Sequence, residues 1–175
     1  MNAIDVRDLL ERPGAARTVH VGEAVPGLHT ELADVPEDTP IQGELTLESV
    51  LEGIYVHGRI AGRFVMRCAR CLKEFDRIFD VAMDEMYVRE PGPEDDYVLA
   101  PDLTLDPEPM VRDAVVLEMP FSPLCRPDCL GLCATCGGDR NLGECPGHEE
   151  PDPRWGGLAG LAELFETAPH DHDAT

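Results

Sequence analysis

The stretch "IYVHGRIAGRFVM" (residues 54–66) alternates apolar and polar side chains along most of its length. A period of two places alternate residues on opposite faces of a β-strand. The stretch therefore predicts a long antiparallel strand with one face in the core and one in water. The side chains expected on the core face are Ile54, Val56, Ile60, Phe64 and Met66.

Alternating segments also flank this strand. Residues 41–47 form one of them, and Gly53 supplies the turn of a hairpin that joins it to the long strand. Residues 75–88 follow as a third strand, and residues 97–99 suit a short edge strand. We therefore predict an antiparallel meander. Its further core-facing side chains are Ile41, Leu45, Leu47, Phe79, Val81, Met83 and Tyr87.

One or two helices are expected to pack on this sheet. Residues 4–11 have the apolar spacing of a short amphipathic helix. Asp106 as N-cap and Pro107 at the first helical position begin a longer helix, which Pro120 ends. The sequence thus predicts an α+β fold. The residues of the longer helix expected to face the core are Val111, Val115 and Leu117.

The balance of charge limits the partners that this chain can bind. It has 14 basic against 35 acidic side chains and a formal net charge of −21. Such an acidic protein repels phosphate backbones, so contact with nucleic acid requires a local basic patch. Arg59, Arg63 and Arg67 form a row on the polar face of the long strand and are the candidate RNA-binding residues. Alternatively, they form ion pairs with acidic residues of neighbouring strands, such as Glu44 or Asp84.

The sequence also suggests a compartment. Residues 1–14 carry charges throughout, and no stretch reaches the roughly 20 apolar residues of a membrane span. A cytoplasmic location without membrane contact is therefore expected. Cysteines stay reduced there, so a cysteine cluster favours metal binding over disulfides.

Seven cysteines and His148 make eight candidate ligands, the number that two closed tetrahedral zinc sites require. Two pairs with zinc-knuckle spacing suit one local site. The four remaining cysteines suit a second site, which would link the sheet to the C-terminal segment. We expect one or two structural zinc ions. The first set is Cys133, Cys136, Cys145 and His148, and the second is Cys68, Cys71, Cys125 and Cys129.

The cysteines also allow uses other than zinc binding. The second set can also be simply reduced thiols, or one site can be shared among more cysteines. Neither the H-E-x-x-H signature of catalytic zinc nor a complete H-x-E…P-C-x-x-C signature occurs in the sequence. A thiol redox protein is a further alternative, although no thioredoxin-like βαβ pattern surrounds either C-x-x-C pair. We therefore expect no enzyme activity and no small-molecule substrate.

The chain is expected to divide into three parts. Residues 1–122 form the α+β sheet domain, and residues 123–165 form a Cys-rich zinc-binding segment packed on it. A short helix is expected from 157 to 165, and residues 166–175 are expected to be a disordered tail.

Three motifs resemble one bacterial family. "CARCLKEF" (68–75), "PLCRPDCLGLCATCGG" (123–138) and "DPRWGGL" (152–158) are similar to motifs of the YceD family, the large ribosomal RNA subunit accumulation proteins. The family motifs fall on all seven cysteines, whereas His148 stands where a further cysteine is expected.

The resemblance implies a non-enzymatic ribosome biogenesis factor that supports the synthesis, processing or accumulation of large-subunit ribosomal RNA. Its partner would be that RNA or a basic ribosomal or assembly protein. A zinc-ribbon module for protein–protein interaction is the alternative that the acidic charge favours.

Overall fold

The computed structural model describes residues 1–148, which fall in two compact units. Residues 1–131 form the first, and the second begins at Leu132. The helix expected from 157 to 165 and the tail 166–175 lie outside the described residues. The division of the chain at residue 122 stays a prediction.

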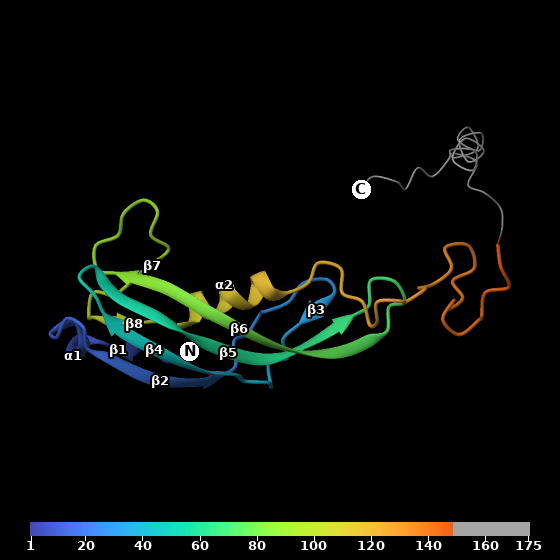
Figure 1. The fold of residues 1–175 in the computed structure, drawn as a ribbon. Helices are drawn as coiled ribbons and strands as arrows, with labels where there is room; N and C mark the ends of the chain where they lie inside the picture. Colours follow the sequence, from blue (N-terminus) through green and yellow to red (C-terminus); the bar gives the residue numbers. More distant parts are fainter. Residues whose placement is uncertain (149–175) are drawn as a thin grey trace, which may run out of the picture. The chain divides into compact units, whose positions relative to one another are not determined.

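An antiparallel sheet forms the centre of the first unit, as Figure 1 shows. Its strand order is β2-β4-β5-β6-β7, with β3 beside β5, and only the β6–β7 pair is parallel. A separate two-stranded sheet joins β1 to β8. The bounds are β1 Ile4–Asp5, β2 Ala16–Glu23, β3 Ala33–Asp34, β4 Ile41–Ser49, β5 Gly53–Arg67, β6 Glu74–Val88, β7 Tyr97–Val98 and β8 Thr104–Leu105.

The long strand β5 has the two faces that its alternation predicts. The even-numbered side chains Ile54, Val56, Ile60, Phe64 and Met66 are all at most 2% exposed. The two even positions without a large side chain are glycines, and the partner strands come close there. A Cβ at Gly62 would lie 2.5 Å from the ring of Phe79, which stacks on Phe64 with centroids 4.4 Å apart. Glycine therefore makes room for an aromatic pair in the core.

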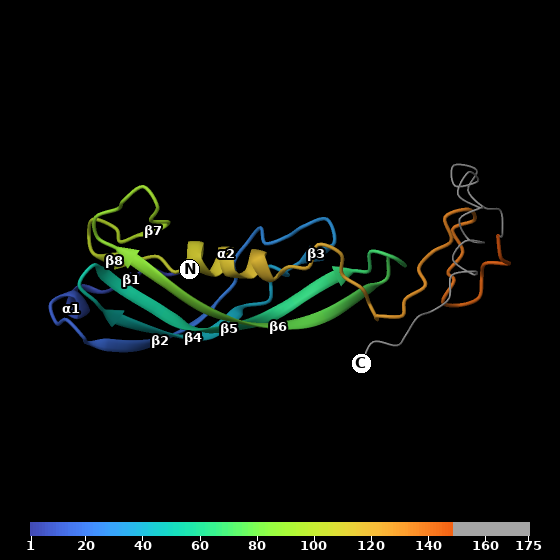
Figure 2. The same cartoon turned by 45° about the horizontal axis from the view of Figure 1, so that its top comes forward.

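Two helices accompany the sheet, α1 (Arg7–Leu10) and α2 (Glu108–Glu118). In Figure 2, α2 lies along one face of the long strands. The helix α2 begins one residue later than predicted, because Pro107 and not Asp106 occupies the N-cap position. Asp106 Oδ1 still accepts the backbone N–H of Glu108 at 3.0 Å. None of the helices in residues 1–148 has the length and apolar character needed to cross a membrane. The fold is thus α+β, as predicted.

Several local predictions were wrong. Ile4 and Asp5 form a strand, because Ile4 pairs with Leu105, and the helix expected over 4–11 covers only Arg7–Leu10. The acidic, proline-containing segment 31–40, whose composition is typical of a loop, contains β3. Leu117 is 87% exposed, and Met110 takes its place in the core at 1%. Leu117 lies two residues beyond buried Val115, so the 3.6-residue helical period turns it away from the sheet.

Candidate metal centres

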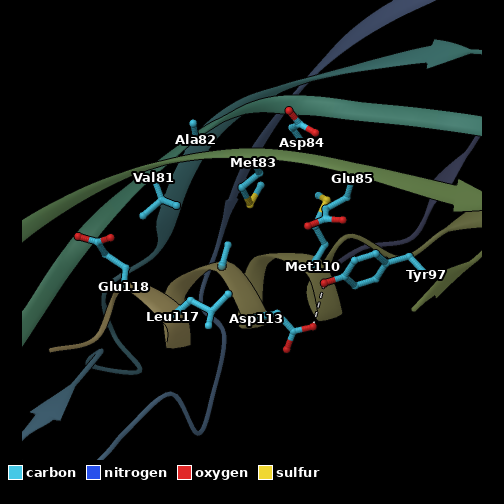
Figure 3. Close-up of a pocket in the computed structure, with 11 residues that line it drawn as sticks. Val81, Ala82, Met83, Asp84, Glu85, Tyr97, Met110, Asp113, Leu117 and Glu118 are labelled. Carbon is cyan, nitrogen blue, oxygen red and sulfur yellow. Dashed lines mark hydrogen bonds between the residues drawn. The ribbon is translucent and has the colours of Figure 1, made fainter. Parts of the chain in front are cut away.

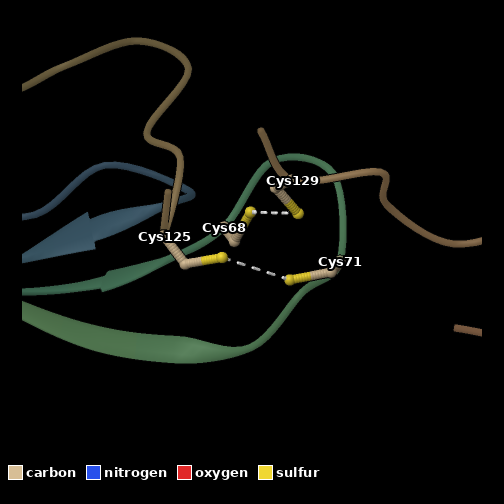
Figure 4. A group of neighbouring side chains, drawn as sticks. All are labelled: Cys68, Cys71, Cys125 and Cys129. Atoms are coloured by element: carbon tan, nitrogen blue, oxygen red, sulfur yellow. Dashed lines mark hydrogen bonds between the residues drawn. The ribbon is translucent and has the colours of Figure 1, made fainter. Parts of the chain in front are cut away.

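Four cysteines from two distant segments meet at one end of the long strands. Cys68 and Cys71 lie in the turn between β5 and β6, while Cys125 and Cys129 lie in the loop after α2. Their sulfur atoms all lie within 4.8 Å of one another. Figure 4 shows the four side chains converging on a common point.

The sulfur spacing of this first cluster fits a tetrahedral metal ion. Cys68 Sγ lies 3.8 Å from Cys129 Sγ, and Cys71 Sγ lies 3.7 Å from Cys125 Sγ. Four sulfurs at the Zn–S distance of about 2.3 Å lie about 3.8 Å apart at the corners of a tetrahedron. A disulfide would require about 2.05 Å. The arrangement can therefore hold one metal ion between four reduced thiols.

The first cluster is part of the folded interior of its unit. Cys68, Cys71 and Cys129 are at most 5% exposed, whereas Cys125 is exposed. The guanidinium group of Arg70 donates to the backbone carbonyl of Cys129 at 2.8 Å. This side chain thus ties the turn after β5 to the loop after α2, a role that its basic charge alone did not reveal.

Backbone N–H groups favour the thiolate form of Cys68. Burial acts to raise its pKa, but N–H donors of Cys125, Cys71 and Arg70 together outweigh burial and lower the pKa to about 6. The neighbouring thiol of Cys71 also donates to this sulfur. These N–H donors favour the thiolate, which is the form that binds metal.

The turn that carries Cys68 closes through two backbone hydrogen bonds. The N–H of Cys68 donates to the carbonyl of Lys73 at 2.9 Å, and the N–H of Leu72 donates to the carbonyl of Cys68 at 2.9 Å. Leu72 has a φ of 62°, in the left-handed region that a leucine seldom adopts. The turn thus holds a strained residue directly after the second cysteine.

The second unit contains the same turn. Here the N–H of Cys133 donates to the carbonyl of Gly138 at 2.9 Å, and the N–H of Gly137 donates to the carbonyl of Cys133 at 2.8 Å. Gly137 has a φ of 73°, so a glycine occupies the position that corresponds to Leu72. The two C-x-x-C pairs are therefore two copies of one local structure.

The second cluster combines this turn with the following C-x-x-H pair. The ligand atoms of Cys133, Cys136, Cys145 and His148 lie within 4.8 Å of one another. Backbone N–H groups of Cys136 and then Thr135 lower the pKa of Cys133 to about 6. Three sulfurs and one imidazole can hold a metal ion here as well. The two clusters thus contain the same two groups of four candidate ligands that the spacing in the sequence suggested.

A buried carboxylate organises the loop between the two pairs of the second cluster. Asp139 is 6% exposed and accepts hydrogen bonds from the backbone and the side-chain amide of Asn141, at 2.8 and 2.7 Å. Its own N–H donates to Glu144 Oε2 at 3.1 Å. Sequence reasoning did not single out Asp139. An Asp-x-Asn pair between two ligand pairs is the signal of a turn closed by a side chain.

The arginine row lies on the exposed face of β5, as predicted, and every member contacts an acidic side chain of β6. These partners are not Glu44 or Asp84, the examples considered from the sequence. The guanidinium charges are therefore largely balanced by neighbouring carboxylates. The pairs are Arg59 with Asp80 at 2.8 Å, Arg63 with Asp76 at 3.0 Å and Arg67 with Glu74 at 3.7 Å.

The fold and the two clusters define an α+β protein with two Cys-rich groups that can each hold a metal ion. Residues 56–162 match the family described as Large ribosomal RNA subunit accumulation protein YceD. The chain belongs to this family. The matched range includes all eight candidate ligands.

Relatives extend over most of the chain. An uncharacterized protein of Mycobacterium tuberculosis is 39% identical over 164 residues, which cover 89% of this chain and 78% of that protein. An uncharacterized protein of Mycobacterium leprae is 32% identical over 166 residues, which cover 90% of this chain and 76% of that protein. The chloroplastic YCED homolog 1 of Arabidopsis thaliana is 37% identical over 57 residues, which are 32% of this chain and 18% of that protein. No solved structure matches the chain significantly.

Proposed function

We propose that this chain is a non-enzymatic ribosome biogenesis factor that supports the accumulation of large-subunit ribosomal RNA. The observation that carries the proposal is the family match, because its range contains both cysteine clusters. The description of the family names the RNA of the large subunit as the molecule that accumulates. The finer role, in synthesis, processing or protection of this RNA, belongs to the same proposal.

We further propose that both clusters bind structural zinc. The donor sets are four thiols in one cluster and three thiols with one imidazole in the other, which are ligand sets that zinc prefers. Four protein ligands complete a tetrahedral shell, so neither ion would offer an open position to a substrate. This coordination supports a role in folding and argues against a catalytic one.

The first zinc ion would staple two parts of the sheet unit together. Its ligands are 54 and 61 residues apart in the two close sulfur pairs. A cross-link that closes such a long loop removes much conformational entropy from the unfolded chain. The second ion would order the Gly-rich segment after Leu132, which has few apolar side chains with which to build a core.

The charges favour a basic protein over bare RNA as the direct partner. A phosphate that approached Arg59, Arg63 or Arg67 would have to displace a carboxylate of β6 from each of them. The net charge of −21 attracts basic ribosomal or assembly proteins and speeds their association. Direct RNA contact through the arginine row is the second candidate, which the exposure of its three side chains supports.

The proposal is tested by complementation in a bacterial strain that lacks its own copy of this protein. The ratio of large- to small-subunit ribosomal RNA is measured after expression of the wild-type chain and of the variant Cys71→Ser/Cys129→Ser. We expect the wild type to restore the ratio and the variant to fail. The exposed variant Thr18→Ser/Thr46→Ser is the control and should restore it. A normal ratio in the empty strain would overturn the proposed function.

A further inference from the structure

A hollow of about 420 Å³ lies between helix α2 and strand β6. Figure 3 shows Glu85 of β6 and Asp113 of α2 facing this space, with Met83 and Met110 beside them. Glu118 of α2 lines the same hollow. The hollow therefore has an apolar floor and an acidic rim.

A second hollow of about 370 Å³ lies at the C-terminal end of the same helix. Its walls are mostly apolar and include Val116, Leu117 and Phe121, together with Leu32. Phe121 is 100% exposed and Leu117 87% exposed, so both apolar side chains are accessible to a partner. Leu117 lines both hollows, so the two adjoin at this side chain, and together we call them the α2 groove.

Carboxylates line the acidic end of the α2 groove, and within residues 1–148 no cationic side chain lines it. No Lys or Arg side chain lines either hollow within residues 1–148, and neither Glu85 nor Glu118 forms an ion pair in that part of the chain. Asp113 Oδ2 accepts a hydrogen bond from the Tyr97 hydroxyl at 2.9 Å. Burial, followed by the charges of nearby carboxylates that include Asp113, raises the pKa of Glu85. Negative charge therefore accumulates here without compensation.

We propose that the α2 groove binds a cationic segment of a partner protein that carries apolar side chains next to its Lys or Arg residues. The apolar side chains would cover Leu117 and Phe121, and the cations would meet the carboxylates of Glu85, Asp113 and Glu118. Exposed apolar side chains beside uncompensated charge are the features that mark a protein-binding surface. The proposal rests on the proposed function and specifies how its basic partner is held.

Charge argues against the chain's own C-terminal segment as the occupant. Residues 149–175 contain seven acidic side chains and one Arg. Such a segment would bring further negative charge to the acidic end of the groove, whereas a cationic segment would neutralise it. The same negative potential repels RNA.

The test uses the full-length chain and a fluorescein-labelled peptide of alternating Lys and Leu, whose affinity is read by fluorescence anisotropy. We expect Glu85→Gln/Asp113→Asn to weaken binding about tenfold. The control Glu11→Gln/Glu37→Gln removes the same net charge from exposed positions outside the groove and should change binding less than about twofold. Leu117→Ser/Phe121→Ser should also weaken binding about tenfold, because both side chains are exposed and their loss leaves the core intact.

Three results would overturn the proposal. One is equal weakening in the groove variant and in the charge-matched control, which would show that only net charge matters. Another is unchanged binding in Leu117→Ser/Phe121→Ser. The third is tighter peptide binding after Leu161→Ser/Phe165→Ser, which would show that the chain's own C-terminal segment occupies the groove. The ribosomal RNA ratio in the complemented strain is read separately, so a failure of the proposed function is distinguishable from a failure of the groove.

Discussion

Cys68 Sγ lies 3.8 Å from Cys129 Sγ, although 61 residues separate the two cysteines in the sequence. The contact joins the end of the long strand β5 to the loop that follows α2. Because a metal ion at this point would be bound by both segments, its affinity becomes part of the folding free energy of the first unit. The second cluster, confined to sixteen consecutive residues from Cys133 to His148, closes only a local loop.

This difference predicts unequal effects of two cysteine substitutions. Cys129→Ser should lower the free energy of unfolding of the sheet by about 4 kcal/mol, since the cross-link that closes the long loop is lost. Cys136→Ser should leave the sheet within about 0.5 kcal/mol of the wild type and loosen only the segment after Leu132. Hydrogen exchange of the β5 and β6 amides measures the stability of the sheet in both variants. Equal loss of protection in these strands would show that the clusters are not independent.

The left-handed residue in the first turn gives a second prediction. Leu72→Val should destabilise the turn by about 1–2 kcal/mol, because a β-branched side chain fits the left-handed region poorly. Leu72→Gly should stay within about 1 kcal/mol of the wild type, since glycine relieves the strain but gains freedom in the unfolded chain. Thermal unfolding of the zinc-loaded protein compares them. A valine variant as stable as the glycine variant would contradict the assigned conformation.

The close contact at Gly62 predicts a cost for even one added methyl group. Gly62→Ala should lower the free energy of unfolding by about 1–3 kcal/mol, because the new Cβ would overlap the ring of Phe79. Gly22→Ala is the matched control, since a Cβ there meets nothing within 4 Å. Chemical denaturation of both variants should therefore show a loss only for the first. Equal stabilities would mean that Phe79 does not pack on Gly62.

The ion pairs of the arginine row predict the outcome of neutralising it. The variant Arg59→Gln/Arg63→Gln/Arg67→Gln should remain folded, because each exposed ion pair contributes at most about 1 kcal/mol. It should also restore large-subunit ribosomal RNA in the strain that lacks the protein, since the proposed partner contact lies elsewhere. A folded variant that fails to restore this RNA would favour direct RNA contact through the row instead.

The parts of the fold that depend on strong alternation were predictable from the sequence. The large side chains at even positions of β5 are all in the core, so its period identified both faces. The strand β2 escaped notice because its apolar residues, Val19 and Val21, are only half-buried and its other positions are polar or small. Ile4 joined a strand because a distant partner, Leu105, was available. Pairing between remote segments is not visible in local spacing.

The candidate ligands were predictable for a different reason. Zinc ligands occur in close pairs, so C-x-x-C and C-x-x-H spacings indicate a site even without the fold. The α2 groove left no such signal. Its members come from β6, from α2 and from the loop around Leu32, and only the folded chain brings them onto one surface.

Native mass spectrometry of the full-length protein, purified under reducing conditions without chelator, tests the central claim most directly. The account predicts two zinc ions per chain, and one each in the variants Cys71→Ser/Cys125→Ser and Cys133→Ser/Cys136→Ser. The first pair of substitutions should remove the ion of the sheet and the second pair the ion of the C-terminal segment. A folded wild-type chain that carries no metal would contradict the account.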